Sequence, residues 1–533
     1  MKRNHTISIF ERLKRLFLRW DKLHIIFILS IISVSFFFFY LNNGLGLSYN
    51  DARSHLDIGR RVVEGLRPGL SQLGSVWLPL NHLLMIPLVW NDWMWHSGFA
   101  GAFWNMLSYV GTGYVIYLYL SKLKVGIIGR LVGVAVFAAN LNILYLQSTA
   151  MTEPLLLFTM TTGSYYLLLY HESDEIFDLV KSAFWIMLAT LTRYDGWFLL
   201  SCATALVAIQ AWRKHGFKRF DGVLVLFLTL AALGVVVWLG WNQLIFGDAL
   251  YWAFGPFSAH AQQQAMAVAG ALPTKGNILL STQVYISSLI SNLYIYPVIL
   301  GIIGMFTLWF DRRLNSSTRI ASTALLSPLF FNIIALVLGF SIIQIPGVLG
   351  STWFNIRYGV MLAPTIAIFI GYLIDRFRLT RVLIITSLII AASYSFVKTD
   401  SVCVDDARAG SSQKNVTEVS SYLATHASNS SELILISVAS HDAIIFSSGL
   451  PMARFIHEGT GRYWENATTR PDRFVKWIVM STNNDQDLTW KAVSRVHNLE
   501  YYHKVAVYPF ADVYELDESM LGNLINTSGN IAK

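Results

Sequence analysis

Long apolar runs recur along this chain, and they constrain its fold more than any other feature. Many approach the length that a helix needs to cross a membrane, roughly 17–25 residues. Hydrophobic residues make up 54% of the 533 positions and charged residues only 14%, whereas soluble proteins average about a quarter charged. The chain is therefore predicted to be an α-helical polytopic membrane protein.

The runs predict about eleven membrane spans. They cover residues 24–41, 98–120, 127–146, 154–170, 180–193, 195–212, 222–246, 286–309, 320–343, 357–374 and 380–397. The fifth and sixth are short and meet at Thr-Arg-Tyr-Asp-Gly, a polar break that is tolerated only where it faces protein or water. No small-residue cleavage site follows the first run, which is therefore predicted to be an uncleaved span.

Basic residues predict the orientation. The N-terminus is rich in Lys and Arg, so it is expected to be cytoplasmic, and basic clusters recur in every second loop. The loop 171–181 is the exception, because its acids outnumber its one lysine. The apolar stretch 76–95 would invert all later loops if it spanned the membrane, so we interpret it as interfacial or partly inserted. Its tryptophans favour that position.

An odd number of spans places the C-terminus outside. From residue 399 the composition is that of a soluble domain. Strand patterns at 432–438, 477–480, 503–508 and 513–516 alternate with helical patterns near 413–427 and 485–497, which predicts a small α/β domain. The expected organisation is a membrane domain over 1–398, with outer loops 42–97 and 247–285, followed by an extracytoplasmic α/β domain over 399–533.

Asp51 follows the first predicted span and is the leading candidate for a catalytic residue. It opens a helical pattern with Leu56 and Val62 on one face, which predicts an amphipathic helix in the outer interface. Asp57 and Glu64 lie at helical spacing from arginines and can pair with them. Asp51 could act as a general base toward a hydroxyl acceptor or cap the helix, and the two roles do not exclude each other.

Two further elements place charged residues at the outer ends of spans. Glu153 could start a helix with Pro154 in its first turn, but an ionisable group at the membrane edge is a functional hypothesis by default. Arg193 and Asp195 flank the polar break. They form either an ion pair that closes the turn or a site where Arg193 meets an anionic group such as a phosphate.

The remaining elements are a long loop and the start of the tenth span. The loop 247–285 contains His260 and Lys275, and such a long loop is often a lid or a binding element. Arg357 and Tyr358 begin the tenth span, where Arg357 is either a snorkelling anchor or a ligand for phosphate. All five elements fall on the outer side of the predicted topology.

Together these motifs resemble those of the GT-C glycosyltransferases. The matching features are an Asp after the first span, Thr-Glu-Pro opening the fourth, Thr-Arg-Tyr-Asp-Gly at the break and Asn-Xaa-Arg-Tyr before the tenth. The resemblance covers most of residues 20–375, and its nearest group is the glycosyltransferase family 39-like branch of protein mannosyltransferases and aminoarabinose transferases. It implies transfer of a hexose or pentose from a dolichyl- or undecaprenyl-phosphate sugar to an acceptor hydroxyl outside the membrane.

The resemblance also implies residue roles. Asp51 matches the catalytic acid of the first outer loop, and Glu153 would be a second acid that orients the acceptor or a basic partner. The implied substrate-binding residues are Arg193, Asp195, Arg357, Lys275, His260 and Tyr358. The family often carries two adjacent acids in the first outer loop, but Ala52 follows Asp51 here, so no metal ligand is assigned. No cofactor is required, although a divalent metal is compatible with the chemistry.

The implied mechanism is single displacement with inversion, with Asp51 as general base. The expected partners are the lipid-linked donor, a glycan, lipid or protein acceptor, and membrane lipids, but no nucleic acid. The expected location is a plasma membrane, or the endoplasmic reticulum in a eukaryote. The alternatives are a membrane transporter or flippase, which would favour repeats with broken helices, and a polymerase or transferase of lipid-linked oligosaccharides, which a paired acid site with a metal would favour.

Overall fold

The computed structural model describes residues 9–255, 258–268, 270, 272–399, 401–410, 413–427, 429, 431–495 and 497–519. Helices predominate, and the chain's contacts divide it into two compact units. The first contains residues 1–46, 76–81 and 102–406, and the second contains 47–75, 82–101 and 407–533. The segment that carries Asp51 therefore belongs to the same unit as the C-terminal domain.

The first unit is helical apart from a two-stranded hairpin, β1 (Gln344–Ile345) and β2 (Leu349–Phe354). Its α-helices are α1 (Ile9–Asn42), α5 (Phe99–Lys122), α6 (Ile127–Ala138), α7 (Leu141–Leu146), α8 (Glu153–Ser173), α9 (Ile176–Thr190), α10 (Asp195–His215), α11 (Phe217–Ala231), α12 (Leu233–Phe246), α13 (Tyr251–Phe254), α14 (Ala259–Val268), α15 (Ile278–Leu293), α16 (Ile295–Phe310), α17 (Ser316–Ser322), α18 (Ser327–Leu338), α19 (Ala363–Arg376), α20 (Arg381–Lys398) and the start of α21 (Val402–Gly410). Two 3₁₀ helices, η2 (Thr323–Leu326) and η3 (Ile356–Leu362), precede α18 and α19.

Five helices among the described residues are long and apolar enough to cross a membrane, or up to seven if each of two bent pairs is one span. This composition, in a mostly helical fold, is that of an integral multi-pass membrane protein. The predicted total of eleven spans and the orientation of the termini stay predictions. The stretch 76–95 forms α3 (Leu80–Val89) and α4 (Asp92–His96), and the ten residues of α3 are too few to span.

The helix is bent or interrupted within three of the predicted spans. The span 286–309 is broken at Tyr294, where α15 and α16 meet at 108°. Tyr294 has a φ of 63°, which no α-helix accommodates. The span 222–246 bends by 49° between α11 and α12, and the span 127–146 divides into α6 and α7 because Asn140 caps Ile143 N at 3.0 Å. A hydropathy pattern shows the apolar runs but does not show where a helix bends or breaks.

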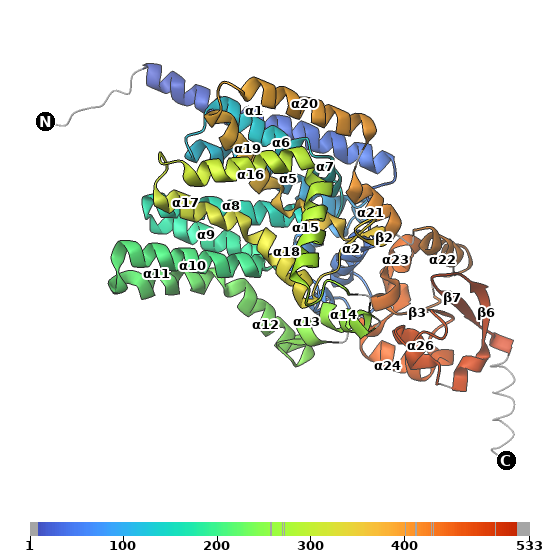
Figure 1. Ribbon diagram of the computed structural model, residues 1–533. Helices are drawn as coiled ribbons and strands as arrows, with labels where there is room; N and C mark the ends of the chain where they lie inside the picture. The colour runs from blue at the N-terminus through green and yellow to red at the C-terminus, as the bar shows by residue number, and fades with distance from the viewer. Residues whose placement is uncertain are drawn as a thin grey trace, which may run out of the picture. The chain divides into compact units, whose positions relative to one another are not determined.

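Close helix packing holds the first unit together. Helices α8, α9, α10 and α11 lie side by side (Figure 1), while α6 and α16 both pack against α19. At Gly304 of α16 an added Cβ would lie 2.2 Å from Phe369 O of α19. Small residues at such contacts let helix backbones approach closely. Inside a membrane the lipid is as apolar as the helix surface, so helices associate through close packing of this kind.

The second unit is built around a five-stranded mixed sheet. Its strands are β3 (Ile434–Ile436), β4 (Phe455–Ile456), β5 (Trp477–Met480), β6 (Tyr502–Val507) and β7 (Asp512–Leu516). Its helices are α2 (Asn50–Val63), η1 (Leu70–Leu73), most of α3, α4, α22 (Gln413–His426), α23 (Val438–Ser448), η4 (Met452–Arg454), η5 (Glu458–Thr460), α24 (Arg462–Thr469), α25 (Pro471–Phe474), α26 (Leu488–Val493) and η6 (His497–Tyr501).

The strand order is β4-β3-β5-β7-β6, with β3 parallel to both neighbours and β7 antiparallel to β5 and β6. All residues of β3 are fully buried, as expected for a parallel strand covered on both faces. The predicted small α/β domain with strands near these positions is confirmed. Strand β4 was missed because its two residues are too few to give a periodic signal.

The helix predicted after Asp51 is present as α2. Arg60 pairs with Glu64 at helical spacing, as predicted. The prediction of an amphipathic helix did not extend to its charged residues Arg53, Asp57 and Arg61, which α2 also buries. Both α23 and η1 of the same unit pack against this helix.

Candidate active site

Glu153 is the centre of a buried charged cluster in the first unit. It is the first residue of α8, with Pro154 in the first turn as the sequence predicts, and its side chain is fully buried. Its Oε1 accepts a hydrogen bond at 3.1 Å from Nη1 of Arg193 and another at 3.1 Å from Nε of Arg357. Charge-assisted hydrogen bonds of this kind are stronger than neutral ones and offset part of the cost of burying a carboxylate.

Arg193 reaches the cluster from the break between α9 and α10. Its Nη1 also donates to Oγ1 of Thr152 at 3.1 Å, and its Nε lies 3.4 Å from Oδ2 of Asp195. The ion pair that closes the turn is therefore present, as one of the two interpretations of this motif predicted. Gly196 permits the turn, since an added Cβ would lie 2.3 Å from the backbone of Ala189.

Arg357 reaches the cluster from η3. Its Nη1 lies 3.8 Å from Oδ2 of Asp406, in the middle of α21. The ring of Tyr358 lies beside both guanidinium groups, 4.9 Å from that of Arg193 and 5.3 Å from that of Arg357. These are cation–π distances, so the tyrosine helps to fix both side chains.

Asparagines hold η3 in place. Asn292, next to the break at Tyr294, donates to Ile356 O at 2.6 Å. Asn142 of α7 donates to Asn292 O at 3.0 Å and accepts from Cys403 N at 3.0 Å. The helix end at the break therefore carries the side-chain amide that holds η3, and with it Arg357.

The structure thus brings together five predicted residues: Glu153, Arg193, Asp195, Arg357 and Tyr358. Sequence reasoning missed Asp406 because it follows the last span and belongs to no recognised motif. It also missed Asn332, whose Nδ2 lies 3.4 Å from Oδ1 of Asp195. An acid soon after the last span was the available signal for Asp406.

Two predicted residues lie outside this cluster as far as the described contacts extend. The ring of His260 lies between those of Phe254 and Phe340, at 5.6 and 5.7 Å. Lys275 is exposed, and its aliphatic stem packs against Gly339. Both stay predictions for substrate binding. The loop that carries them contains α13 and α14 and ends where α15 begins at Ile278.

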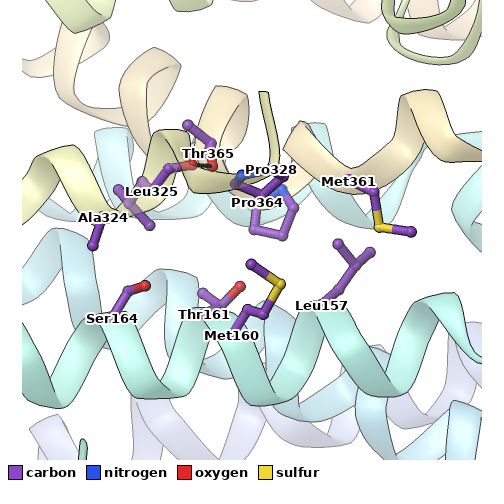
Figure 2. A pocket seen from close by; sticks show the side chains of 10 residues that line it. All are labelled: Leu157, Met160, Thr161, Ser164, Ala324, Leu325, Pro328, Met361, Pro364 and Thr365. Carbon is purple, nitrogen blue, oxygen red and sulfur yellow. Dashed lines mark hydrogen bonds between the residues drawn. The ribbon is translucent and has the colours of Figure 1, made fainter. Parts of the chain in front are cut away.

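An apolar pocket begins about one turn beyond the cluster. Leu157 follows Glu153 by four residues on α8, and Met361 follows Arg357 by four. Figure 2 shows the residues of α8 along one side of the pocket and those of η2, α18, η3 and α19 along the other. The lining residues are Leu157, Met160, Thr161, Ser164, Ala324, Leu325, Pro328, Met361, Pro364 and Thr365.

Asp51 lies in the second unit, half-buried in the first turn of α2. The N-cap of this helix is Tyr49, so the N-cap interpretation of Asp51 is wrong by two positions. Asp51 instead lies in the first turn of the helix, near the positive end of the helix dipole.

No protein-family model and no curated protein sequence matches the chain. Solved structures do. The aminoarabinose transferase ArnT from Cupriavidus metallidurans, bound to undecaprenyl phosphate, matches over 90% of this chain and 97% of its own, with a TM-score of 0.54 and 12% identity. The archaeal oligosaccharyltransferase AglB from Archaeoglobus fulgidus, in complex with an inhibitory peptide and a dolichol-phosphate, matches over 92% and 73%, with a TM-score of 0.52 and 12% identity.

The apo state of the same ArnT gives a TM-score of 0.50 at 13% identity, over 90% of this chain and 97% of that one. At these identities the likeness establishes the fold. ArnT and AglB are both GT-C membrane glycosyltransferases. The predicted GT-C-like fold is therefore confirmed as a fold.

Proposed function

We propose that this protein transfers a monosaccharide from a polyprenyl-phosphate sugar to an acceptor hydroxyl on the outer face of the membrane. The observation that carries the proposal is the buried cluster in which Glu153 holds Arg193 and Arg357, within a GT-C fold. Guanidinium groups gathered in this way suit the phosphate head of such a donor. Two structural neighbours hold lipid phosphates of this kind, undecaprenyl phosphate in ArnT and a dolichol-phosphate in AglB.

Arg193 is the proposed contact for the donor phosphate. Its side chain is 19% exposed, whereas that of Arg357 is 7% exposed. A guanidinium has five N–H donors, more than its contacts with Glu153, Thr152 and Asp195 require. The more deeply buried Arg357 supports Glu153, which in turn orients the acceptor. Lys275 and His260 stay weaker candidates.

Asp51 is the proposed general base. The acceptor oxygen forms a bond to the anomeric carbon while the bond from that carbon to the phosphate oxygen breaks. The hydroxyl proton passes to the Asp51 carboxylate, and polyprenyl phosphate leaves with the bonding electron pair. Attack opposite the leaving group inverts the anomeric configuration. The positive charge of Arg193 stabilises the leaving phosphate.

The direct test is a donor panel. The full-length protein in lipid nanodiscs is incubated with radiolabelled dolichyl- and undecaprenyl-phosphate sugars, with and without a crude acceptor fraction, and release of polyprenyl phosphate is measured. We expect at least one lipid monophosphate sugar to be consumed and nucleotide sugars to be left intact. Consumption of none by protein that is folded would contradict the proposal.

The match to AglB supports a second candidate, a transferase of lipid-linked oligosaccharides. The same panel separates the two when it includes a lipid pyrophosphate oligosaccharide. Consumption of that compound alone would favour the second candidate. Movement of an intact lipid-linked sugar across a vesicle membrane, without transfer, would instead favour a flippase.

A further inference from the structure

The second unit has a sheet whose parallel strands end at the kind of edge where a ligand usually binds, the edge formed by their carboxyl ends. In open α/β sheets, ligands bind outside the carboxyl ends of the parallel strands, where the strand order reverses. Here the chain runs from β3 to β4 on one side and then crosses to β5 on the other. The reversal therefore lies at the carboxyl end of β3, where α23 begins.

Side chains of the protein already fill this edge. Glu458, just after β4, accepts hydrogen bonds from the first two amides of α23, Val438 N at 3.0 Å and Ala439 N at 2.7 Å. It occupies the helix N-terminus where an anion would otherwise bind. Asp487, after β5, accepts a hydrogen bond from His441 at 2.7 Å. A soluble anionic ligand therefore has no place at this helix end.

The same edge holds α2. Nη1 of Arg61 lies 3.4 Å from Oδ1 of Asp442, and both side chains are only about a tenth exposed, at 10% and 11%. Arg61 also acts electrostatically on Glu458. At the end of α2, Glu64 accepts a hydrogen bond from Met452 N at 2.9 Å. The helix therefore takes the position of the ligand in this fold.

Asp57 of α2 is a third charged residue at the contact between Arg61 and Asp442. It is fully buried one helical turn before Arg61. Burial, and then the neighbouring Asp442, raise the pKa of Asp57 well above its ordinary value, while Arg61 lowers it. Arg61 places a positive charge beside these two buried carboxyl groups.

We propose that the C-terminal α/β domain is a positioning domain for Asp51, with Asp442 as the positioning residue that holds Arg61. An α-helix is stiff, so a contact that fixes Arg61 also fixes the position of Asp51. Asp51 lies ten residues before Arg61, about 15 Å along the helix axis. The inference rests on the proposed function, since it takes Asp51 as the general base. It gives the C-terminal domain a role in the transfer reaction.

The test combines amide hydrogen exchange with kinetics on the full-length protein in nanodiscs. Asp442→Ala should accelerate exchange in α2 and lower kcat roughly 10- to 100-fold per folded enzyme, because small misplacements of a reacting group are costly. The KM for the donor should change little. Asp442→Asn keeps an oxygen acceptor for Arg61 and should be affected less. The matched control is Asp485→Asn, an exposed residue of the same domain, which should change neither measurement.

Unchanged exchange in α2 of Asp442→Ala would overturn the inference, as would faster exchange with unchanged kcat. A loss of activity that only tracks the folded fraction would do the same. If Asp442→Ala does not fold, Asp442→Asn gives the same comparison. Full activity of Asp51→Asn would refute the base itself, and this failure is distinguishable because exchange in α2 does not depend on catalysis.

Discussion

Arg357 donates its Nε to Oε1 of Glu153 at 3.1 Å and so joins residues 204 positions apart in the sequence. The same oxygen accepts from Arg193, so one fully buried carboxylate unites η3, α8 and the break before α10. The other oxygen, Oε2, has no hydrogen-bond partner among the described residues. In our proposal this oxygen is the one that can orient an acceptor.

Glu153→Gln should destabilise the protein strongly. The substitution leaves two buried guanidinium groups without their shared counter-charge, and breaking a buried ion pair costs about 3–5 kcal/mol. Thermal unfolding in detergent measures the effect. The control is Glu172→Gln at the other end of α8, where the partly exposed pair with Lys122 should contribute about 1 kcal/mol or less. Equal stability of the two variants would contradict the role given to Glu153.

Arg193→Lys should weaken donor binding more than folding. Lysine keeps the charge but loses the planar set of donors that suits a phosphate. The loss of one charge-assisted hydrogen bond, about 1.5–3 kcal/mol, corresponds to a rise in donor KM of roughly 10-fold or more. Arg357→Lys should instead lower the melting temperature, because that side chain is the more buried. A donor KM unchanged in Arg193→Lys would remove the phosphate contact from the proposal.

Gly196→Ala tests the polar break between α9 and α10. The added methyl group would lie 2.3 Å from backbone atoms of Ala189, which cannot move aside as a flexible side chain can. We expect a loss of about 1–3 kcal/mol, measured as a lower melting temperature. Gly222→Ala is the control, since an added Cβ there meets nothing within 4 Å. Identical melting temperatures would show that the break tolerates a side chain.

The sequence predicted much of this site. Each of Glu153, Arg193 and Arg357 stands next to a boundary that hydropathy or proline marks, so topology placed them on one side. Their mutual contact could not be read from the chain, because it depends on how η3 packs against α8. The break at Tyr294 was missed for a related reason: its positive φ and the asparagine contacts around it leave no trace in an apolar pattern.

In the second unit, the strands were predicted better than the way in which the chain segments assemble. The strands near 477–480 and 513–516 were predicted well, because alternation and β-branched residues mark them. The assembly of this unit from three separate chain segments was not predicted. Charged residues are expected to face solvent, so the burial of Asp57 and Arg61 could not be anticipated. Part of their environment is Asp442, 381 positions after Arg61, and sequence spacing gives no sign of that contact.

His457 should make the second unit sensitive to acid. Burial, and then the nearby positive charge of Arg61, lower the pKa of His457 to about 3. Its Nδ1 accepts a hydrogen bond from Gly459 N at 3.1 Å, which requires the neutral ring. The unfolded chain binds a proton near its ordinary pKa of about 6.5. Stability contributed by the neutral ring is therefore present above that pH and is lost as the pH falls from about 6.5 toward 3.

His457→Gln should weaken this dependence, because the amide oxygen can accept the same hydrogen bond without titrating. The measurement is the denaturant midpoint at pH 7 and at pH 5, followed by hydrogen exchange in β4 and α23. We expect the difference between the two pH values to be smaller in the variant than in the wild type. An unchanged difference would assign the acid sensitivity to other groups.

Asp51→Asn tests the central claim most directly, because it keeps the shape of the side chain and removes only its basicity. The measurement is transfer from the best polyprenyl-phosphate sugar of the donor panel, with donor binding and thermal stability measured on the same preparation and Asp485→Asn as control. The account predicts that transfer falls roughly 10²- to 10⁴-fold while donor binding and stability are retained. Transfer at the wild-type rate by Asp51→Asn would contradict it.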